Sequence, residues 1–530
     1  MKHTTLFLLA LVLAGTLCGQ SGYQRTHNKM LDEAQLLLAA GDHLEAAKIY
    51  QRLVRLDTSF AEVSYELGLC YLSLPGAWEK AVPLFERSAR QGHTEAVHQL
   101  ALCRHRASKF DEAIDLFNRY KQIHHRAEPD AHVDDRIAMV RNAKRMVRQP
   151  VDLSIRNMGP TVNSPSHDYC PLVTSDGDRM YFTSRREGTV GSRRDPSGQY
   201  FEDIYTAIRT DGVWSNAVNV GRPLNSDLQD ATVGLAPDGA SMIVYRTSDD
   251  LVSGDLFESR QENGAWSEPM IMTERINSPS HEPSASISPD GNEIYFTSDR
   301  PGGFGGRDLY RIRRLPNGEW SLPLNLGPTI NSPYDEDAPF IHSDGMTLFF
   351  SSNSPRSMGG YDVFKSTLLN YDDCSWSDPE NMGYPLNTVN DDIYFCLSED
   401  GTTGYFSSER NGGLGAQDIY QVEFPSNQLT YLIVRGVVMD ALDMPVKARI
   451  MLTDLSGEEI VGIYNTDQHT GRYLMVLEPG ERYSLQVEAP GHELVVEEIH
   501  AMEGEGAMEM SHETRLNSLD TSSRLSDHGQ

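Results

Sequence analysis

Five aspartates recur in one sequence context and could together bind a cation. Each opens an acid, aliphatic, aromatic triplet, and the five acids are Asp203, Asp255, Asp308, Asp362 and Asp418. A ring of such carboxylates could hold a metal ion or a basic peptide. Like charges in a ring repel one another unless they are compensated. We therefore favour a structural interpretation, in which each aspartate accepts backbone N–H bonds at a strand start or pairs with Arg185, Arg300 or Arg410.

A glycine-rich run, "PGGFGGRDLY" at 301–310, precedes one of these aspartates. It resembles a phosphate loop or one turn of a calcium-binding β-roll. A calcium β-roll needs its repeats in immediate tandem, and a phosphate loop opens a helix. The run instead returns once per repeat, as "SMGGYDVF" at 357–364 and "NGGLGAQDIY" at 411–420. These glycines therefore predict a sharp turn between two strands.

The elements that position these residues recur with a period of 52 to 62 residues. Asp-Gly pairs begin at Asp176, Asp238, Asp290, Asp344 and Asp400, and each precedes a short β-rich run such as "IYFTS". Four of the five tryptophans share one repeat position, namely Trp214, Trp266, Trp320 and Trp376. Short strands separated by turn signals predict a β-propeller. The pattern at 288–310 resembles the PD40, or TolB-type, propeller repeat, and implies five blades, with a degenerate sixth as the alternative.

The last repeat ends at Phe424 without its Trp-Ser strand, and the missing piece lies at the other end of the repeat region. "VDLSIRNMGPTVNS" at 151–164 aligns with "LPLNLGPTINS" at 322–332. We expect this earlier segment to complete the last blade and so to remove exposed sheet edges. The predicted propeller spans residues 150–426.

A different repeat precedes the propeller. "GDHLEAAKIYQRLVRLD" (41–57) returns at 76–92 and at 108–122, with a small residue followed four positions later by an aromatic one. Together with Leu67, Gly68 and Tyr71, this resembles the tetratricopeptide repeat, whose helical pairs stack into a solenoid with a concave binding groove. The expected solenoid spans 24–149, with a capping helix at 131–148. Cys70 and Cys103 occupy matching positions and are expected in its core.

A third module is expected at 430–502, where short β-rich runs are broken by proline and glycine. Gly436, Asp440, Pro445, Gly471 and Tyr473 carry a resemblance to the carboxypeptidase-regulatory-like, prealbumin-type β-sandwich. That family carries no peptidase centre. The polar residues 503–530 are expected to be disordered.

Charge and the N-terminus bound the compartment and the partners. The chain has 46 basic and 76 acidic residues, a net charge of -30, which disfavours binding to nucleic acid. Residues 1–19 combine Lys2 with an apolar run and small residues, which is typical of an export signal. Cys18 is a candidate for lipidation, although Leu17 departs from the usual small residue, and simple cleavage is preferred. No later segment reaches the ~18 apolar residues of a transmembrane helix.

Motifs for catalysis and cofactor binding are missing. The sequence has no Gly-x-Ser-x-Gly elbow, no His-Glu-x-x-His, no phosphate-binding P-loop and no dinucleotide fingerprint. Histidines occupy unlike repeat positions, so no metal cluster can be assembled. We expect no enzyme, no cofactor and no metal.

The order solenoid, propeller, sandwich resembles periplasmic, outer-membrane-associated proteins of Bacteroidota, including PorE-type components linked to type IX secretion. Those proteins commonly end in an OmpA-like peptidoglycan-binding domain, which this sequence lacks. The resemblance implies a non-catalytic scaffold, exported to the periplasm or outer membrane, that binds envelope proteins through the solenoid groove and the propeller face. The alternative is a module for glycans or peptidoglycan fragments, with Tyr169, Tyr334 and Tyr394 as candidate aromatics at the propeller mouth.

Overall fold

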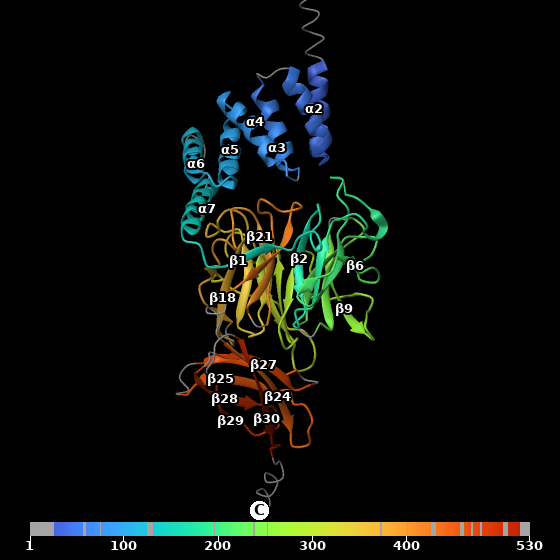
Figure 1. Ribbon diagram of the computed structural model, residues 1–530, viewed down its shortest axis with the longest axis vertical. Helices are drawn as coiled ribbons and strands as arrows, with labels where there is room; N and C mark the ends of the chain where they lie inside the picture. Colours follow the sequence, from blue (N-terminus) through green and yellow to red (C-terminus); the bar gives the residue numbers. More distant parts are fainter. Residues whose placement is uncertain are drawn as a thin grey trace, which may run out of the picture. The chain divides into compact units, whose positions relative to one another are not determined.

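The computed structural model describes most of the chain between residues 26 and 519 (Figure 1). The internal stretches outside the description are 57–59, 75, 125–130, 196, 237–238, 252, 372–373, 400, 426–430, 456–459, 468–469, 478–479 and 502–506. The described residues form two compact units. One comprises those up to Arg141 with Arg194–Tyr200, and the other comprises Asn142–Arg193 with those from Phe201 onward.

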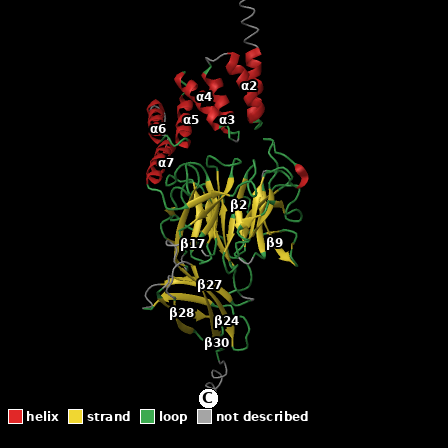
Figure 2. Ribbon diagram, in the orientation of Figure 1, coloured by secondary structure: helices red, strands yellow, loops and turns green. Residues whose placement is uncertain are grey.

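The described residues of the first unit up to Arg141 are mainly helical, and Figure 2 shows the helices in red. A helix at 26–39 is followed by α2 (His43–Leu56), α3 (Ala61–Leu72), α4 (Trp78–Arg90), α5 (Thr94–Arg106), α6 (Phe110–His124) and α7 (Ala131–Arg148). Consecutive helices from α2 to α6 contact one another. No helix among the described residues is long and apolar enough to cross a membrane.

Small and aromatic residues set the packing of these helices, as their spacing predicts. Each second helix buries the predicted pair completely, and these pairs are Ala46 with Tyr50, Ala81 with Phe85, and Ala113 with Phe117. Gly68 of α3 allows the closest approach, because a Cβ atom there would lie 2.5 Å from Cε1 of Phe85. Cys70 and Cys103 are buried, as predicted, and burial raises the pKa of their thiols to about 12 and about 11.

Five antiparallel sheets follow, numbered here in chain order. The first sheet contains β2 (Asp168–Val173), β3 (Arg179–Ser184), β4 (Asp203–Thr210), β5 (Val213–Trp214) and β6 (Val218–Asn219). The second contains β7 (Asp230–Leu235), β8 (Ser241–Thr247), β9 (Gly254–Glu262), β10 (Ala265–Trp266) and β11 (Met270–Ile271). The third contains β12 (Ala285–Ile287), β13 (Glu293–Ser298), β14 (Asp308–Arg313) and β15 (Leu324–Asn325).

The remaining two sheets have the same order. The fourth contains β16 (Glu336–Ile341), β17 (Thr347–Ser352), β18 (Asp362–Asn370), β19 (Ser375–Trp376) and β20 (Glu380–Asn381). The fifth contains β21 (Asp392–Leu397), β22 (Thr403–Ser408), β23 (Asp418–Glu423) and β1 (Ser154–Asn157). The first strands contact one another in a closed cycle, β2 to β7, β12, β16, β21 and back to β2. This radial arrangement is that of a β-propeller.

Strand β1 closes the cycle, as the alignment of 151–164 predicts. It pairs antiparallel with β23, from Ser154 opposite Glu423 to Asn157 opposite Tyr420. The glycines of the five Asp-Gly turns also behave as expected. Their φ angles lie between 63° and 70°, at Gly177, Gly239, Gly291, Gly345 and Gly401. A left-handed residue there lets each hairpin turn tightly.

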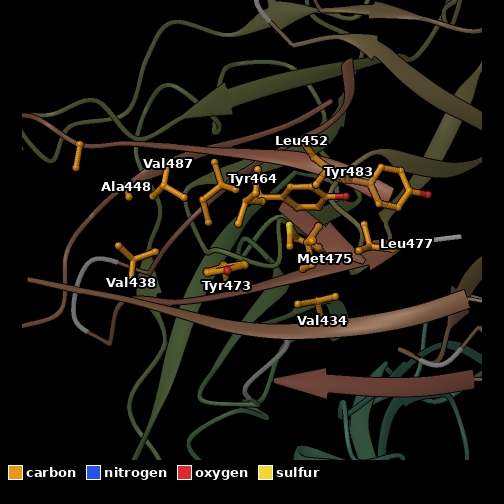
Figure 3. Close-up of a cluster of buried hydrophobic side chains, with 14 of the residues drawn as sticks. Val434, Val438, Ala448, Leu452, Tyr464, Tyr473, Met475, Leu477, Tyr483 and Val487 are labelled. Atoms are coloured by element: carbon orange, nitrogen blue, oxygen red, sulfur yellow. The ribbon is translucent and has the colours of Figure 1, made fainter. Parts of the chain in front are cut away.

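Two further sheets follow the propeller strands in sequence. A four-stranded sheet contains β25 (Arg449–Asp454), β26 (Ile460–Asn465), β28 (Arg482–Glu488) and β29 (Val495–His500). A three-stranded sheet contains β24 (Tyr431–Asp440), β27 (Arg472–Leu477) and β30 (Ala507–Leu516). The two sheets share one core, in which Val434 and Met475 of one sheet gather with Leu452 and Val487 of the other (Figure 3).

The expectation that residues 503–530 are disordered is wrong for part of that segment. Strand β30 pairs in parallel with β24 over its whole length. Its side chains alternate, so that Thr514 and Leu516 are fully buried while Glu513 and Arg515 stay exposed. Polar residues on both faces hide this period of two in the sequence.

Candidate functional site

The recurring aspartates occupy strand starts, where they bind backbone and asparagine donors. In four of the five, one carboxylate oxygen accepts both a backbone N–H from the preceding turn and an asparagine Nδ2–H from the outer strand. The asparagine contacts are Asn219 to Asp203 (2.6 Å), Asn325 to Asp308 (2.7 Å), Asn381 to Asp362 (2.6 Å) and Asn157 to Asp418 (2.7 Å). The backbone donors are Val190, Phe304, Met358 and Leu414. These contacts fix the third strand of a sheet to its turn and to its outer strand.

Asp255 departs from this pattern. It is partly exposed, and the position that holds asparagine in the other sheets is Ile271, opposite Phe257. Among the described residues, no group of three or more histidine, cysteine, aspartate or glutamate side chains is arranged to hold a metal ion.

The predicted arginine partners of these aspartates are wrong. Arg300 pairs with Glu282 and Arg410 with Asp392, which are acids on the approach to, or at the start of, first strands. In the first sheet the equivalent arginine is Arg186, paired with Asp168, rather than Arg185. Adjacent residues of an extended chain point to opposite sides, so the two arginines reach different partners.

The recurring tryptophans pack across sheet boundaries. Trp214 lies edge-on to Tyr405 of the fifth sheet, Trp266 to Tyr181 of the first, and Trp376 to Tyr295 of the third, with ring centroids 5.7 to 6.1 Å apart. Trp320 packs in the cluster that contains Ile243 of the second sheet. Trp214, Trp266 and Trp376 therefore each join their own sheet to the preceding one in the ring.

Five asparagines in the same register were missed by the sequence reasoning. The side chain of each bridges both backbone groups of one third-strand residue; they are Asn163, Asn225, Asn277, Asn331 and Asn387. For example, Asn331 accepts from Leu309 N at 2.8 Å and donates to Leu309 O at 3.0 Å. Their spacings repeat the period of the Asp-Gly turns, so the signal was present in the sequence.

The glycine-rich runs are packing turns, as predicted. A Cβ atom on Gly305 would lie 2.2 Å from the carbonyl oxygen of Tyr334, and one on Gly415 would lie 1.9 Å from that of Ser166. The turn thus rests directly on the backbone that enters the next sheet. Glycine is required because no side chain fits there.

A polar cavity opens at the end of the ring where the first strands begin, and we call it the mouth. Its lining includes Tyr169, Tyr361 and Tyr394, the acids Glu202, Asp337, Asp391 and Glu409, and the bases Arg185 and Arg307. The rings of Tyr169 and Tyr394 lie 5.8 Å apart at 29°. Two of the three predicted aromatics therefore line the mouth, from within strands β2 and β21. Tyr334 is not among its lining residues.

Backbone irregularity shapes the wall of the mouth. Strands β2, β16 and β21 each carry a register shift, and Cys170, Ala338 and Tyr394 at these places have φ between 50° and 59°. Such bulges re-aim side chains at functional sites. At the shift in β16, Asp337 accepts from Arg307 Nη1 at 2.6 Å and from the hydroxyl of Ser284.

Burial and acid neighbours keep the mouth tyrosines protonated. Burial, and then the carboxylates of Asp337 and Asp335, raise the pKa of Tyr361. Burial and Glu202 likewise raise the pKa of Tyr169 well above its ordinary value. These hydroxyls are therefore neutral hydrogen-bonding groups at neutral pH.

A second candidate surface lies on the first helices of the solenoid pairs. Tyr65 of α3 lies among Glu62, Glu66, Glu95 and Gln99, and burial followed by Glu95 raises the pKa of its hydroxyl. The side chain of Glu62 also contacts His93 at 2.8 Å. We call Tyr65, Glu62, Glu66, Glu95 and Gln99 the Tyr65 cluster.

Cys18 lies outside the described residues, so the structure does not bear on its lipidation.

Comparison with known proteins finds a family match within the helical segment. Residues 31–96 match the tetratricopeptide repeat. A search of curated proteins gives no match. One similar solved structure is the type III secretion chaperone SycD of Yersinia enterocolitica, in complex with a peptide of the translocator YopD. Its sequence is 17% identical to this one, the TM-score is 0.21, and the alignment covers 23% of this chain and 95% of the chaperone.

One solved structure is similar over a longer stretch of the chain. TolB of Acinetobacter baumannii is 15% identical with a TM-score of 0.31, and the alignment covers 56% of this chain and 71% of TolB.

A type III secretion complex from Aeromonas hydrophila is similar over a shorter stretch. It is 23% identical with a TM-score of 0.22, and the alignment covers 23% of this chain and 85% of that one. The family match is confined to residues 31–96.

Proposed function

We propose that this chain is a non-catalytic scaffold of the cell envelope that binds partner proteins through its solenoid and the mouth of its propeller. The Tyr65 cluster is the observation that carries the proposal. It places three carboxylates and one tyrosine on α3 and α5, the first helices of two tetratricopeptide pairs. First helices line the concave surface through which such solenoids bind other proteins.

Charge reversal in the Tyr65 cluster tests this function. Full-length protein carrying Glu66→Lys and Glu95→Lys serves as bait in a capture from envelope membranes. Glu45→Lys with Glu79→Lys, on the second helices α2 and α4, is the matched control, because both residues are exposed and net charge changes by the same amount. Partners should be lost with the cluster variant and retained with the control. Equal capture by all three proteins contradicts the proposal.

The proposal also assigns the other modules. The five sheets would be the five blades of the propeller, and the two C-terminal sheets a carboxypeptidase-regulatory-like β-sandwich. The shared core of those sheets and the closed cycle of first strands support these assignments. An experimental structure of the full chain tests both.

Export and anchoring rest on the sequence of residues 1–19. We infer that the protein acts at the periplasmic side of the outer membrane, in type IX secretion or outer-membrane assembly, from its resemblance to PorE-type proteins. Cell fractionation tests the location. Labelling with a fatty-acid analogue tests the anchor, because a lipidated protein should take up the label and the Cys18→Ser variant should not. A cytoplasmic protein with no dependence of secretion on its gene contradicts this part.

Glycan or peptidoglycan-fragment binding is the second candidate, and the tyrosine pair of the mouth favours it. Aromatic rings can stack on sugar rings while neighbouring carboxylates and arginines bind hydroxyl groups. Titration of full-length protein with muropeptides, against a Tyr169→Leu variant, measures this directly.

A further inference from the structure

The mouth carries an excess of negative charge. Four carboxylates line it, those of Glu202, Asp337, Asp391 and Glu409. The basic groups in the lining are the guanidiniums of Arg185 and Arg307 and the imidazole of His167. Residues 149–530 repeat this imbalance, since they contain 26 of the basic and 59 of the acidic residues. A cavity lined in this way attracts cations.

Neither arginine offers a free site for an anion. Arg307 is committed to Asp337, with Nη1 and Oδ2 2.6 Å apart. Arg185 lies close enough to lower the pKa of Tyr169 and has its own partner in the structure. An incoming carboxylate would have to displace these contacts while it faced four acids.

The aromatic walls select the shape of the cation. Tyr169 and Tyr394 both line the mouth, and the planes of their rings are 29° apart. A planar guanidinium stacks on such rings and donates hydrogen bonds sideways to carboxylates, whereas an ammonium group lacks a flat face. The mouth measures about 330 Å³, which is sufficient for one side chain.

We propose that the mouth binds an arginine side chain of a partner protein, stacked against Tyr169 and Tyr394 and bonded to the surrounding carboxylates. The inference rests on the proposed function, because it names the chemistry by which the propeller recognises its partner. Glu202 is the acid whose loss should matter most, since it bonds to Tyr169 and faces the same opening.

Calorimetric titration of full-length protein with N-acetyl-arginine amide tests the site. Binding should weaken about fivefold or more in Tyr169→Leu, which removes the ring, and much less in Tyr169→Phe, which keeps it. Glu202→Gln should weaken binding, whereas Glu319→Gln, an exposed acid of the third sheet, should leave it unchanged. N-acetyl-lysine amide should bind less tightly than the arginine probe. Thermal melts of all variants establish that each is folded.

Three results overturn the inference. One is the absence of arginine-probe binding, another is equal binding by the Leu and Phe variants, and the third is saturable binding of muropeptides in place of the probe. If the probe fails while partner capture still depends on the Tyr65 cluster, the arginine site is wrong and the scaffold function stands. If cluster charge reversal also leaves capture unchanged, both fail.

Discussion

Asn157 Nδ2 donates to Asp418 Oδ2 at 2.7 Å, across 261 positions of sequence. In the third sheet the same contact, Asn325 to Asp308, spans 17 positions. One repeated interaction therefore serves two purposes, since it completes a sheet locally in one place and closes the whole ring in the other.

Replacing Asn157 should open the ring closure. Asn157→Leu removes one of the two hydrogen bonds that Oδ2 of the buried Asp418 accepts and leaves the bond from Leu414 N. Loss of a hydrogen bond to a charged group costs about 1.5–3 kcal/mol, and the change also loosens the four-residue pairing of β1 with β23. Hydrogen exchange should then rise in β23. Asn325→Leu removes the same contact but should raise exchange around β14 alone. Unchanged protection of β23 in Asn157→Leu would show that the asparagine does not hold the closure.

Asp203 should make the propeller less stable as pH rises. Burial raises the pKa of its carboxyl to about 7, and Oδ1 has no hydrogen-bond partner among the described residues. Between about pH 4 and 7 the folded state holds a proton that the unfolded state releases, so unfolding free energy falls by at most about 1.4 kcal/mol per pH unit. Asp203→Asn should remove this slope.

Denaturant unfolding at several pH values, followed by tryptophan fluorescence, measures the slope, because four of the five tryptophans lie in the propeller repeats. Asp176→Asn provides a control of opposite sign. The Thr174 hydroxyl, and then the Asp178 backbone, lower the pKa of Asp176. That variant should lose stability at neutral pH and match the parent in acid.

Gly68→Ala should destabilise the solenoid, because its new Cβ would lie 2.5 Å from the Phe85 ring. Overpacking of this kind costs about 1–3 kcal/mol. Phe85→Leu makes room, so the double variant should be more stable than the sum of the two single effects predicts. Helix unfolding followed by circular dichroism gives the coupling, and additivity of the two changes would contradict the close contact.

Trp376→Ala should cost more than Trp320→Ala. Trp376 is 5% exposed and lies edge-on to Tyr295 of the neighbouring sheet, whereas Trp320 is only partly buried. Loss of a buried tryptophan costs about 3–5 kcal/mol. Chemical denaturation compares the two variants, and equal losses would argue against the role of Trp376 as a joint between sheets.

Repetition made much of the fold predictable. The Asp-Gly turns, the aspartate triplets and the tryptophans recur at similar intervals, and the alignment of 151–164 with 322–332 is sufficient to predict that β1 pairs with β23. Strand β30 was not predicted, because it occurs once and its inward positions include polar Thr514. A single strand with mixed polarity has no repeat to reveal it.

The mouth was harder to predict for the opposite reason. At the second position of the first strand, or its equivalent, the five repeats carry Tyr169, Ala231, Pro283, Asp337 and Ile393. Residues that maintain the ring must repeat, whereas residues that recognise an asymmetric ligand need not. The acids at the starts of the first strands recur, but their partners differ between sheets. Asp168 of the first sheet pairs with Arg186, whereas Glu336 of the fourth sheet accepts hydrogen bonds from serines.

Strand β1 also dictates the order of events during synthesis. Asn157 leaves the ribosome 261 residues before its partner Asp418 does. Until then the fifth sheet lacks β23, and the segment at 154–157 has no partner strand. The ring of the nascent propeller therefore stays open until its last strand is made. A chain truncated before β23 keeps β1 and β22 as unpaired strand edges, which are prone to aggregation.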